Sequence, residues 1–223
     1  VTVEKIKIGE SAVVLTGKGL GLLGDQLDGM HFKILPVEGN ELIFDQHTRL
    51  PIDPMIGVIG VAPEGEAINC GTPDVHGGNM DTTLIREMST VYLPVWAEGG
   101  LLALGDLHAV MADGEVGVSG AEIPGKVQIK IDLKKGIHLP TPLVIDNGII
   151  AVIYSSETLD QAVAKSVEIA RELIAENTEL STAEIAMLLS LVGHIRISQV
   201  VDPLKTARCE IPLSVLKNYG FTI

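Results

Sequence analysis

Residues 101–115 read Leu-Leu-Ala-Leu-Gly-Asp-Leu-His-Ala-Val-Met-Ala-Asp-Gly-Glu, an apolar run that passes into a group of polar side chains. We expect the apolar part to be a strand, in which residues two apart point to the same face. Asp106 and His108 would then lie side by side at the strand end, with Asp113 and Glu115 following within one turn. An imidazole among carboxylates is typical of a metal site or a proton-transfer site.

A second group of polar residues lies upstream, in the run His76-Gly77-Gly78-Asn79-Met80-Asp81. Purely structural roles also fit the individual residues. Asp-Gly pairs close turns, and a partly buried histidine can simply have its hydrogen bonds satisfied within the fold. Two groups of histidine and aspartate beside glycines, in a chain with only six histidines, nevertheless favour a catalytic site.

The composition restricts both the fold and the partners. Aromatic residues make up only 3% of the 223 residues, so Val, Ile and Leu must build the core, which favours β-rich architecture. The net charge of −13 argues against nucleic acid and against anionic membrane surfaces. No signal peptide or bilayer-spanning run is recognisable, and the two cysteines lack metal or disulfide spacing, so we expect a cytoplasmic protein.

The hydrophobic pattern predicts strands first and helices late, and therefore a mainly β fold with a few helices (α+β). Thr158 and Ser181 are expected N-caps of helices over 159–175 and 182–192, the second of them buried inside the protein or at a subunit interface. Glycines in the buried run 55–62 indicate close approach to another element or a ligand. Strands are predicted at 1–8, 12–16, 55–62, 90–96, 126–133, 148–155, 194–201 and 208–212, with a hairpin over 31–44.

Four stretches of the chain together resemble the acetamidase/formamidase family. The motifs His-Gly-Gly-Asn-x-Asp and Gly-Asp-x-His-Ala occur in the order of that family, and Glu122 matches one of its acidic positions, whereas Ala112 stands where glycine is expected. The similar stretches are 54–63, 76–81, 94–108 and 113–116, and the resemblance extends over essentially all of 1–223.

This resemblance implies hydrolysis of a short aliphatic amide, formamide or acetamide, to the carboxylate and ammonia. It also implies a β-sandwich core, to which we add a smaller α/β portion that carries the helices near 158–193. Family members carry a further segment before residue 1, and this chain opens within an alternating strand. We therefore expect an N-terminal segment or fragment of the same protein to complete the catalytic region 1–223.

Amide hydrolysis requires an activated water, a stabilised oxyanion and a proton for the leaving nitrogen. We hypothesise that a divalent metal performs the first two tasks, zinc first, with calcium or manganese as alternatives. Glu115 would be the general base, with Asp106 and His108 also catalytic. The expected metal ligands are His76, Asp81, Asp106 and His108, and the expected substrate-binding residues are Gly77, Gly78, Asn79 and Gly105.

Two other interpretations of the same residues stay open. In a metal-free amidase, Asp106 or Glu115 would act directly while His108 carries the proton. In a non-catalytic β-sandwich binding module, the clusters would hold structural calcium, although the two motif histidines count against an oxygen-ligand site. For the amidase we expect a small amide as the partner, and we expect no binding to nucleic acid or to a membrane. We also expect the protein to form a homo-oligomer.

Overall fold

The computed structural model describes residues 1–222, in which strands far outnumber helices, as the mainly β expectation required. The strands are β1 (Thr2–Ile8), β2 (Ser11–Gly17), β3 (Met30–Glu38), β4 (Glu41–Ile43), β5 (Arg49–Pro51), β6 (Met55–Gly60), β7 (Gly77–Asn79), β8 (Thr90–Tyr92), β9 (Ala103–His108), β10 (Gly125–Lys130), β11 (Leu143–Asp146), β12 (Ile149–Ser156), β13 (His194–Gln199) and β14 (Lys205–Pro212). The helices are η1 (Gly24–Gln26), α1 (Leu159–Asn177), α2 (Thr182–Val192) and α3 (Leu213–Lys217).

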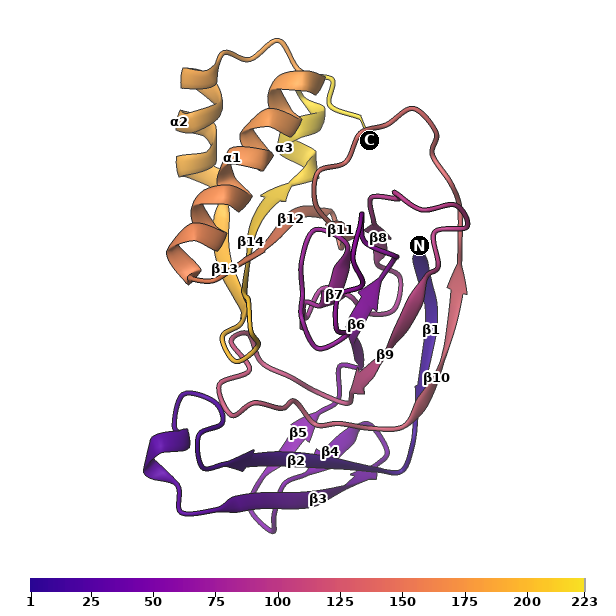
Figure 1. The fold of residues 1–223 in the computed structure, drawn as a ribbon, viewed down its shortest axis with the longest axis vertical. Coiled ribbons are helices and arrows are strands. Elements are labelled where there is room, and N and C mark those ends of the chain that lie inside the picture. Colours follow the sequence, from indigo (N-terminus) through magenta and orange to yellow (C-terminus); the bar gives the residue numbers. More distant parts are fainter. Residues whose placement is uncertain (223) are drawn as a thin grey trace.

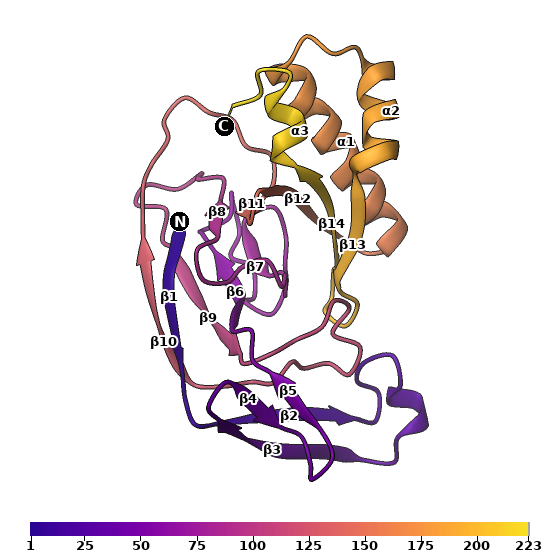
Figure 2. The ribbon, with the colours of Figure 1, turned by 180° about the vertical axis from the view of Figure 1, so that it is seen from behind.

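Three antiparallel sheets make up the β structure. The largest has seven strands in the order β10-β1-β8-β11-β12-β14-β13. A four-stranded sheet has the order β2-β3-β4-β5, and a three-stranded sheet has β6 between β7 and β9. The four-stranded sheet lies at one end of the molecule, and α1, α2 and α3 lie at the other (Figures 1 and 2).

The centre of the seven-stranded sheet is buried on both faces, as the alternating side chains of β12 show. Ala151 and Ile153 pack into the core shared with the three-stranded sheet. Ile150 and Val152, which point the other way, pack into the core shared with the helices. The fold is thus a sandwich of sheets with a layer of helices on its outside, and it matches the expected β-sandwich with a helix-bearing portion.

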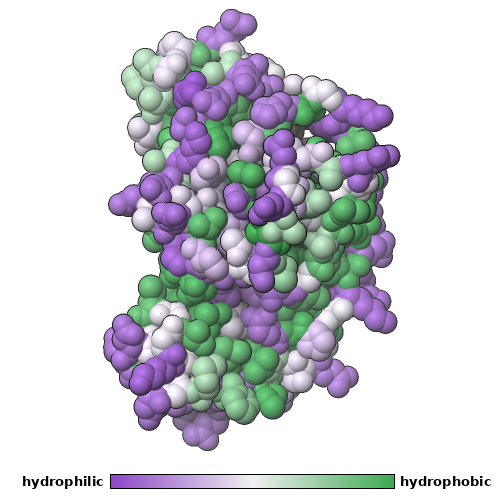
Figure 3. Space-filling model, in the orientation of Figure 1, coloured by the Kyte–Doolittle hydropathy of each residue, from purple (hydrophilic) through white to green (hydrophobic). Residues whose placement is uncertain are grey.

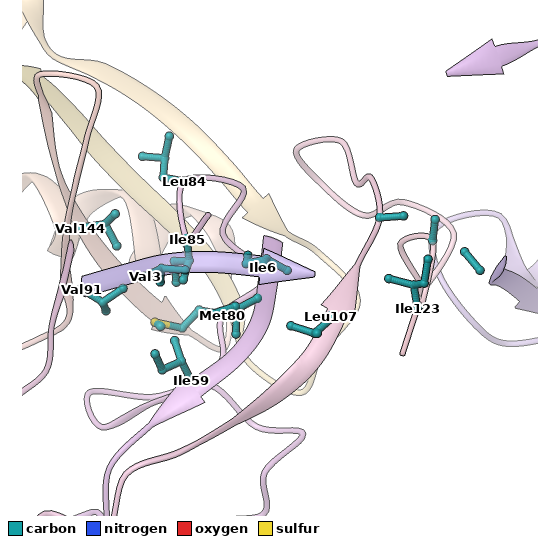
Figure 4. Packing of buried hydrophobic residues seen from close by; sticks show 14 of the residues in the cluster. Val3, Ile6, Ile59, Met80, Leu84, Ile85, Val91, Leu107, Ile123 and Val144 are labelled. Carbon is teal, nitrogen blue, oxygen red and sulfur yellow. The ribbon is translucent and has the colours of Figure 1, made fainter. Parts of the chain in front are cut away.

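The core between the sheets positions the strands that carry the polar motifs. Val3 and Ile6 of β1 face Ile59 of β6, Met80 after β7 and Leu107 of β9 (Figure 4). A bulge between Val3 and Lys5 explains how side chains three residues apart reach one face. Because Met80 and Leu107 are fixed in this core, their polar neighbours in sequence are held rigidly.

Both late helices begin where the sequence predicts. The Thr158 side chain accepts a hydrogen bond from the Gln161 amide at the start of α1, and Ser181 forms a capping box with Glu184 at the start of α2. Ile185 of α2 is buried against α1 and the sheet, as expected. Met187 and Leu191 on the other side of α2 remain 61% and 81% exposed, so the described chain buries only half of this apolar helix.

The four-stranded sheet leaves an apolar face in solvent. Met30, Phe32 and Ile34 alternate along β3 and are each more than 60% exposed, and apolar residues gather at this end of the molecule (Figure 3). The bend at Gly9 turns the chain from the seven-stranded sheet into this one. Within residues 1–222 no helix is long and apolar enough to cross a membrane.

Candidate active site

The ends of β7 and β9 meet beside Gly57 in β6. Both strands run antiparallel to β6, and Asp106 of β9 stands opposite Gly57, between the paired positions on either side. The amide of Asp81, just past β7, donates to the Gly57 carbonyl at 3.2 Å. A β-carbon on Gly57 would lie 2.5 Å from Asp81 Oδ1 and 2.6 Å from Asp106 Oδ2. The close approach predicted for the glycines of this strand is thus confirmed at Gly57.

The His108 ring is fully buried beside three carboxyl groups. Its Nε2 atom lies 3.1 Å from Glu122 Oε1, 3.6 Å from Asp106 Oδ1 and 3.9 Å from Asp81 Oδ1. Among residues 1–222, neither ring nitrogen finds a hydrogen-bonding partner with suitable geometry, and the buried Asp81 Oδ1 atom finds none either. Buried polar atoms in proteins nearly always have partners, so donor atoms left free in this way are typical of a ligand-binding site.

The ligand-type atoms fall into two groups that share His108. Asp81, His108 and Glu115 form one group, and Asp106, His108 and Glu122 form the other. In each group the candidate atoms lie within 4.8 Å of one another. Oxygen and imidazole atoms at this spacing are compatible with a divalent cation, because they can approach one ion without rearrangement of the backbone.

Three carboxylate residues of the two donor groups have strained backbone conformations. Asp81 has φ 42°, Asp106 has φ 59° and Glu115 has φ 43°, all in the left-handed region that L-residues rarely adopt. Such conformations cost stability and persist where the surrounding structure imposes them, most often at functional sites. The fold therefore directs these carboxylates toward His108 against their local preference.

The crowding of acidic groups shifts the pKa values of the cluster. Burial raises the pKa of Asp81 to about 9, with the charge of Glu115 adding to the effect. Burial also raises the pKa of Glu115 to about 7, against the opposing influence of His108. For His108, burial favours the neutral ring, but Asp106 and Glu122 outweigh it and raise the pKa to about 10. A bare cluster therefore holds protons that a cation would displace.

A buried arginine anchors the loop that carries Glu115. The guanidinium of Arg208, only 2% exposed, donates to Asp113 at 2.8 Å and to Glu210 at 2.7 Å. Next to it, the Gly114 amide donates to the Ser198 carbonyl at 2.9 Å. The Asp113 carboxylate is thus committed to an ion pair, and it positions its neighbour Glu115 instead of joining the cluster.

Asp202 is a member of this region that the sequence analysis missed. Its Oδ2 atom accepts a hydrogen bond from Asn79 Nδ2 at 3.0 Å. Burial raises the pKa of Asp202 to about 6, with the Asp106 charge adding to the shift. Asp202 lies in the β13–β14 connection, far from both motifs in sequence, and only the fold brings it to them. No spacing rule could have identified it.

Gly120 supports the His108 ring from its side. A β-carbon on Gly120 would lie 2.7 Å from Nδ1 and 2.8 Å from Cγ of His108, so the ring packs directly on the backbone there. Sequence analysis missed this contact as well, because an isolated glycine in a loop gives no indication of what covers it.

The structure does not bring His76 to the other predicted ligands. Its carbonyl accepts from the Val61 amide, whereas His108 pairs with Met55 at the opposite end of β6, roughly 20 Å away along the strand. The His76 ring covers Gly78, whose β-carbon would lie 3.1 Å from Nε2, and burial lowers the pKa of His76.

The two glycines of this motif have packing functions. Gly77 has φ 97° and Gly78 has φ 86°, which glycine adopts at little cost. A β-carbon on Gly77 would lie 2.3 Å from the Ile59 carbonyl oxygen, and the Gly77 amide already donates to the Asp74 carbonyl at 2.9 Å. That amide is therefore engaged within the fold rather than free for a substrate.

An open cavity of about 490 Å³ lies beside the cluster. Asn79, Gly105 and Asp106 contribute polar or backbone surface to it, and Val58 lies between the strands that carry them. The remaining lining residues are Cys70, Gly71, Ala103 and Leu104. A small, uncharged molecule would fit between this apolar wall and the carboxylates.

Comparisons with known proteins identify relatives over most of the chain. A profile of the acetamidase/formamidase family matches residues 64–217. The crystal structure of a predicted acetamidase/formamidase from Thermoanaerobacter tengcongensis is 51% identical, with a TM-score of 0.98 over 100% of this chain and 74% of that one.

Two curated relatives match over shorter regions. A formamidase of Methylophilus methylotrophus is 44% identical over 64 residues, which are 28% of this chain and 16% of the relative. An acetamidase of Mycolicibacterium smegmatis is 33% identical over 102 residues, which are 41% of this chain and 25% of the relative. The matched regions thus span a quarter or less of these two relatives.

Proposed function

The chain belongs to the acetamidase/formamidase family, and from this premise we propose that the cluster around His108 hydrolyses a short aliphatic amide, formamide or acetamide, to the carboxylate and ammonia. The observation that carries the proposal is the buried imidazole of His108. Within residues 1–222 its ring nitrogens have no hydrogen-bonding partner, and carboxylate oxygens lie 3.1–3.9 Å from Nε2. The cavity beside Asp106 supports a substrate of small size.

The donor set favours a divalent cation held by His108 and Asp81, with a further oxygen from Asp106 or Glu122, while Glu115 lies within reach of the same atoms. When bound, such an ion supplies Lewis-acid polarisation of a carbonyl oxygen and makes water more acidic. Two imidazoles led to the expectation of zinc, but only one histidine belongs to the groups found in residues 1–222. This oxygen-rich set suits manganese or calcium as well as zinc, so the metal identity stays a prediction.

Glu115 is the side chain best suited to general base chemistry. Glu115 lies in one donor group with Asp81 and His108. A base is most effective when its pKa lies near the working pH, and in the cation-free cluster burial raises the pKa of Glu115 to about 7. We propose that its carboxylate takes a proton from the attacking water and later delivers it to the leaving nitrogen. The anchoring of the neighbouring Asp113 by Arg208 keeps the carboxylate in place for both transfers.

Asp106 and Glu122 hold the His108 ring in orientation. Their carboxyl groups flank Nε2, and the Gly120 backbone lies against the ring. The backbone of Asp106 is strained, so the folded protein already bears the conformational energy of this arrangement before any substrate binds. The site is thereby preorganised, which lowers the reorganisation needed during the reaction.

Chelation tests the proposed function. Ammonia release from formamide should disappear after treatment with a chelator and return when Zn²⁺, Mn²⁺ or Ca²⁺ is added back. Elemental analysis of the same samples should show loss and recovery of about one or two ions per chain, as expected for the two overlapping donor groups.

Other outcomes of that test separate the alternatives. Full activity in demonstrably metal-free protein would favour the metal-free amidase, with Asp106 or Glu115 acting directly. Cation binding without any amide hydrolysis would favour the calcium-binding module. The homo-oligomer stays a prediction of the sequence, and the exposed residues Met187 and Leu191 of α2 are surfaces that a subunit contact would cover.

A further inference from the structure

The two ends of the Asn79 side-chain amide have different surroundings. Asn79 closes β7 opposite Val58, and Gly105 stands opposite Val58 on the other side, so that Asn79 lies in the row of residues beside the cavity. Its Nδ2 atom donates to Asp202 Oδ2 at 3.0 Å. Its Oδ1 atom is buried and has no hydrogen-bonding partner in the described chain.

The Asp202 contact decides which way the amide faces. A carboxylate is only an acceptor, so it selects the N–H end of the Asn79 amide and leaves the carbonyl end for something else. Asn79 lines the same cavity as Asp106, which places the Asn79–Asp202 pair at the border of the His108 cluster. A buried amide oxygen without a partner costs stability, and such a cost is tolerated where a ligand completes the bond.

We propose that Oδ1 of Asn79 recognises the NH₂ group of a primary amide substrate, and that Asp202 is a positioning residue which keeps this oxygen turned toward the substrate. The inference rests on the proposed amide hydrolysis and deepens it. It gives the expected substrate-binding residue Asn79 the role of an acceptor, because the donor end of its side chain faces Asp202.

The proposal makes the enzyme selective for substrates with N–H groups. A primary amide offers two N–H donors, whereas an ester of the same acid offers none. A site that is built to accept a hydrogen bond discriminates strongly against analogues that lack the donor. Hydrolysis of formamide should therefore depend on Asn79, whereas hydrolysis of methyl formate should not.

The first test compares the two substrates in the N79A variant. The kcat/KM for formamide should fall at least about tenfold, as expected for one lost hydrogen bond at the reacting group, and methyl formate hydrolysis should change less than about threefold. Equal losses for both substrates would overturn the proposal while leaving the amidase function intact. Hydrolysis of neither substrate by the wild-type protein would overturn the proposed function and, with it, this inference.

An exchange of the two polar groups tests the role of Asp202. In N79D two carboxylates face each other, and in D202N the amide orientation is no longer imposed, so both variants should lose formamide activity. The double variant N79D/D202N restores one donor facing one acceptor and again leaves an oxygen for the substrate. It should regain at least about tenfold of the N79D loss in formamide hydrolysis. The gain should be larger for formamide than for methyl formate, whereas restoring a merely structural pair would help both substrates alike.

Two controls accompany the exchange. The variant N218D places the same substitution on an exposed residue after α3 and should behave as wild type. Cation content and the urea unfolding midpoint should be measured for every variant, so that loss of the ion or of the fold is recognised. A folded, cation-loaded N79D/D202N variant that is no more active than N79D would overturn the role of Asp202.

Discussion

Replacing Gly57 by alanine should disrupt the candidate site while leaving the fold in place. The new β-carbon would lie 2.5 Å from Asp81 Oδ1 and 2.6 Å from Asp106 Oδ2, whereas ordinary contacts begin near 3.4 Å. Both carboxylates must therefore move by roughly 0.8–0.9 Å. The backbone at Gly57 does not have a positive φ, so alanine introduces no conformational strain of its own.

The size of the effect follows from this displacement. A misplacement of about 1 Å in a catalytic arrangement costs roughly 100-fold in rate, so formamide turnover of G57A should fall by about that factor. Cation affinity should fall in parallel, because Asp81 and Asp106 contribute to the two donor groups. Overpacking should lower the free energy of unfolding by about 1–3 kcal/mol, partly offset by the stiffer unfolded chain of an alanine variant.

The measurements are ammonia release, cation titration by calorimetry and urea unfolding followed by circular dichroism. The matched control is G29A, because no heavy atom lies within 4 Å of the β-carbon position at Gly29 and its φ is not positive. G29A should resemble the wild type in all three measurements. Wild-type activity and cation affinity in G57A would refute the view that Gly57 sets the spacing of Asp81 and Asp106.

Three further predictions concern the base, the buried arginine and the effect of pH. E115Q should lower kcat by roughly 10²–10⁴-fold, as expected for loss of a general base, and an unchanged kcat would remove Glu115 from that role. R208L should lower the free energy of unfolding in urea by about 3–5 kcal/mol, because the buried Glu210 loses the guanidinium at 2.7 Å and keeps only the exposed Arg196 at 3.8 Å; a loss below 1 kcal/mol would contradict this. In chelated protein, the folded state holds protons on Asp81 up to a pKa of about 9 and on His108 up to about 10, above their ordinary values of 3.8 and 6.5. Its stability should therefore fall as pH rises from about 4 to about 10, and a urea midpoint that rises over this range would contradict the assigned shifts.

Local rules of sequence predicted much of the fold. The caps at Thr158 and Ser181 are set by side chains within three residues of the helix start, so both helices could be located from the sequence. Alternation predicted the strands for a similar reason. The division of the strands into three sheets was not accessible, because pairing depends on long-range contacts such as Thr2 with Thr90.

The same distinction between local rules and long-range contacts applies to the candidate site. Asp106 and His108 are two residues apart in one strand, and the sequence alone placed them on one face. His76 was grouped with them because its motif contains Asp81, but β7 runs extended along β6 between these two residues and leaves the His76 ring at the far end of β6. Asp202 reaches Asn79 only through the β13–β14 connection, which no spacing in the sequence indicates.

The central claim, that a divalent cation binds between His108 and the surrounding carboxylates, is tested most directly by anomalous diffraction from crystals grown with Zn²⁺ or Mn²⁺. The account predicts an anomalous peak about 2.0–2.2 Å from Nε2 of His108, with an oxygen of Asp81 or Asp106 in the same coordination sphere. A protein that hydrolyses formamide under these conditions, yet shows no anomalous peak within reach of His108, would contradict it.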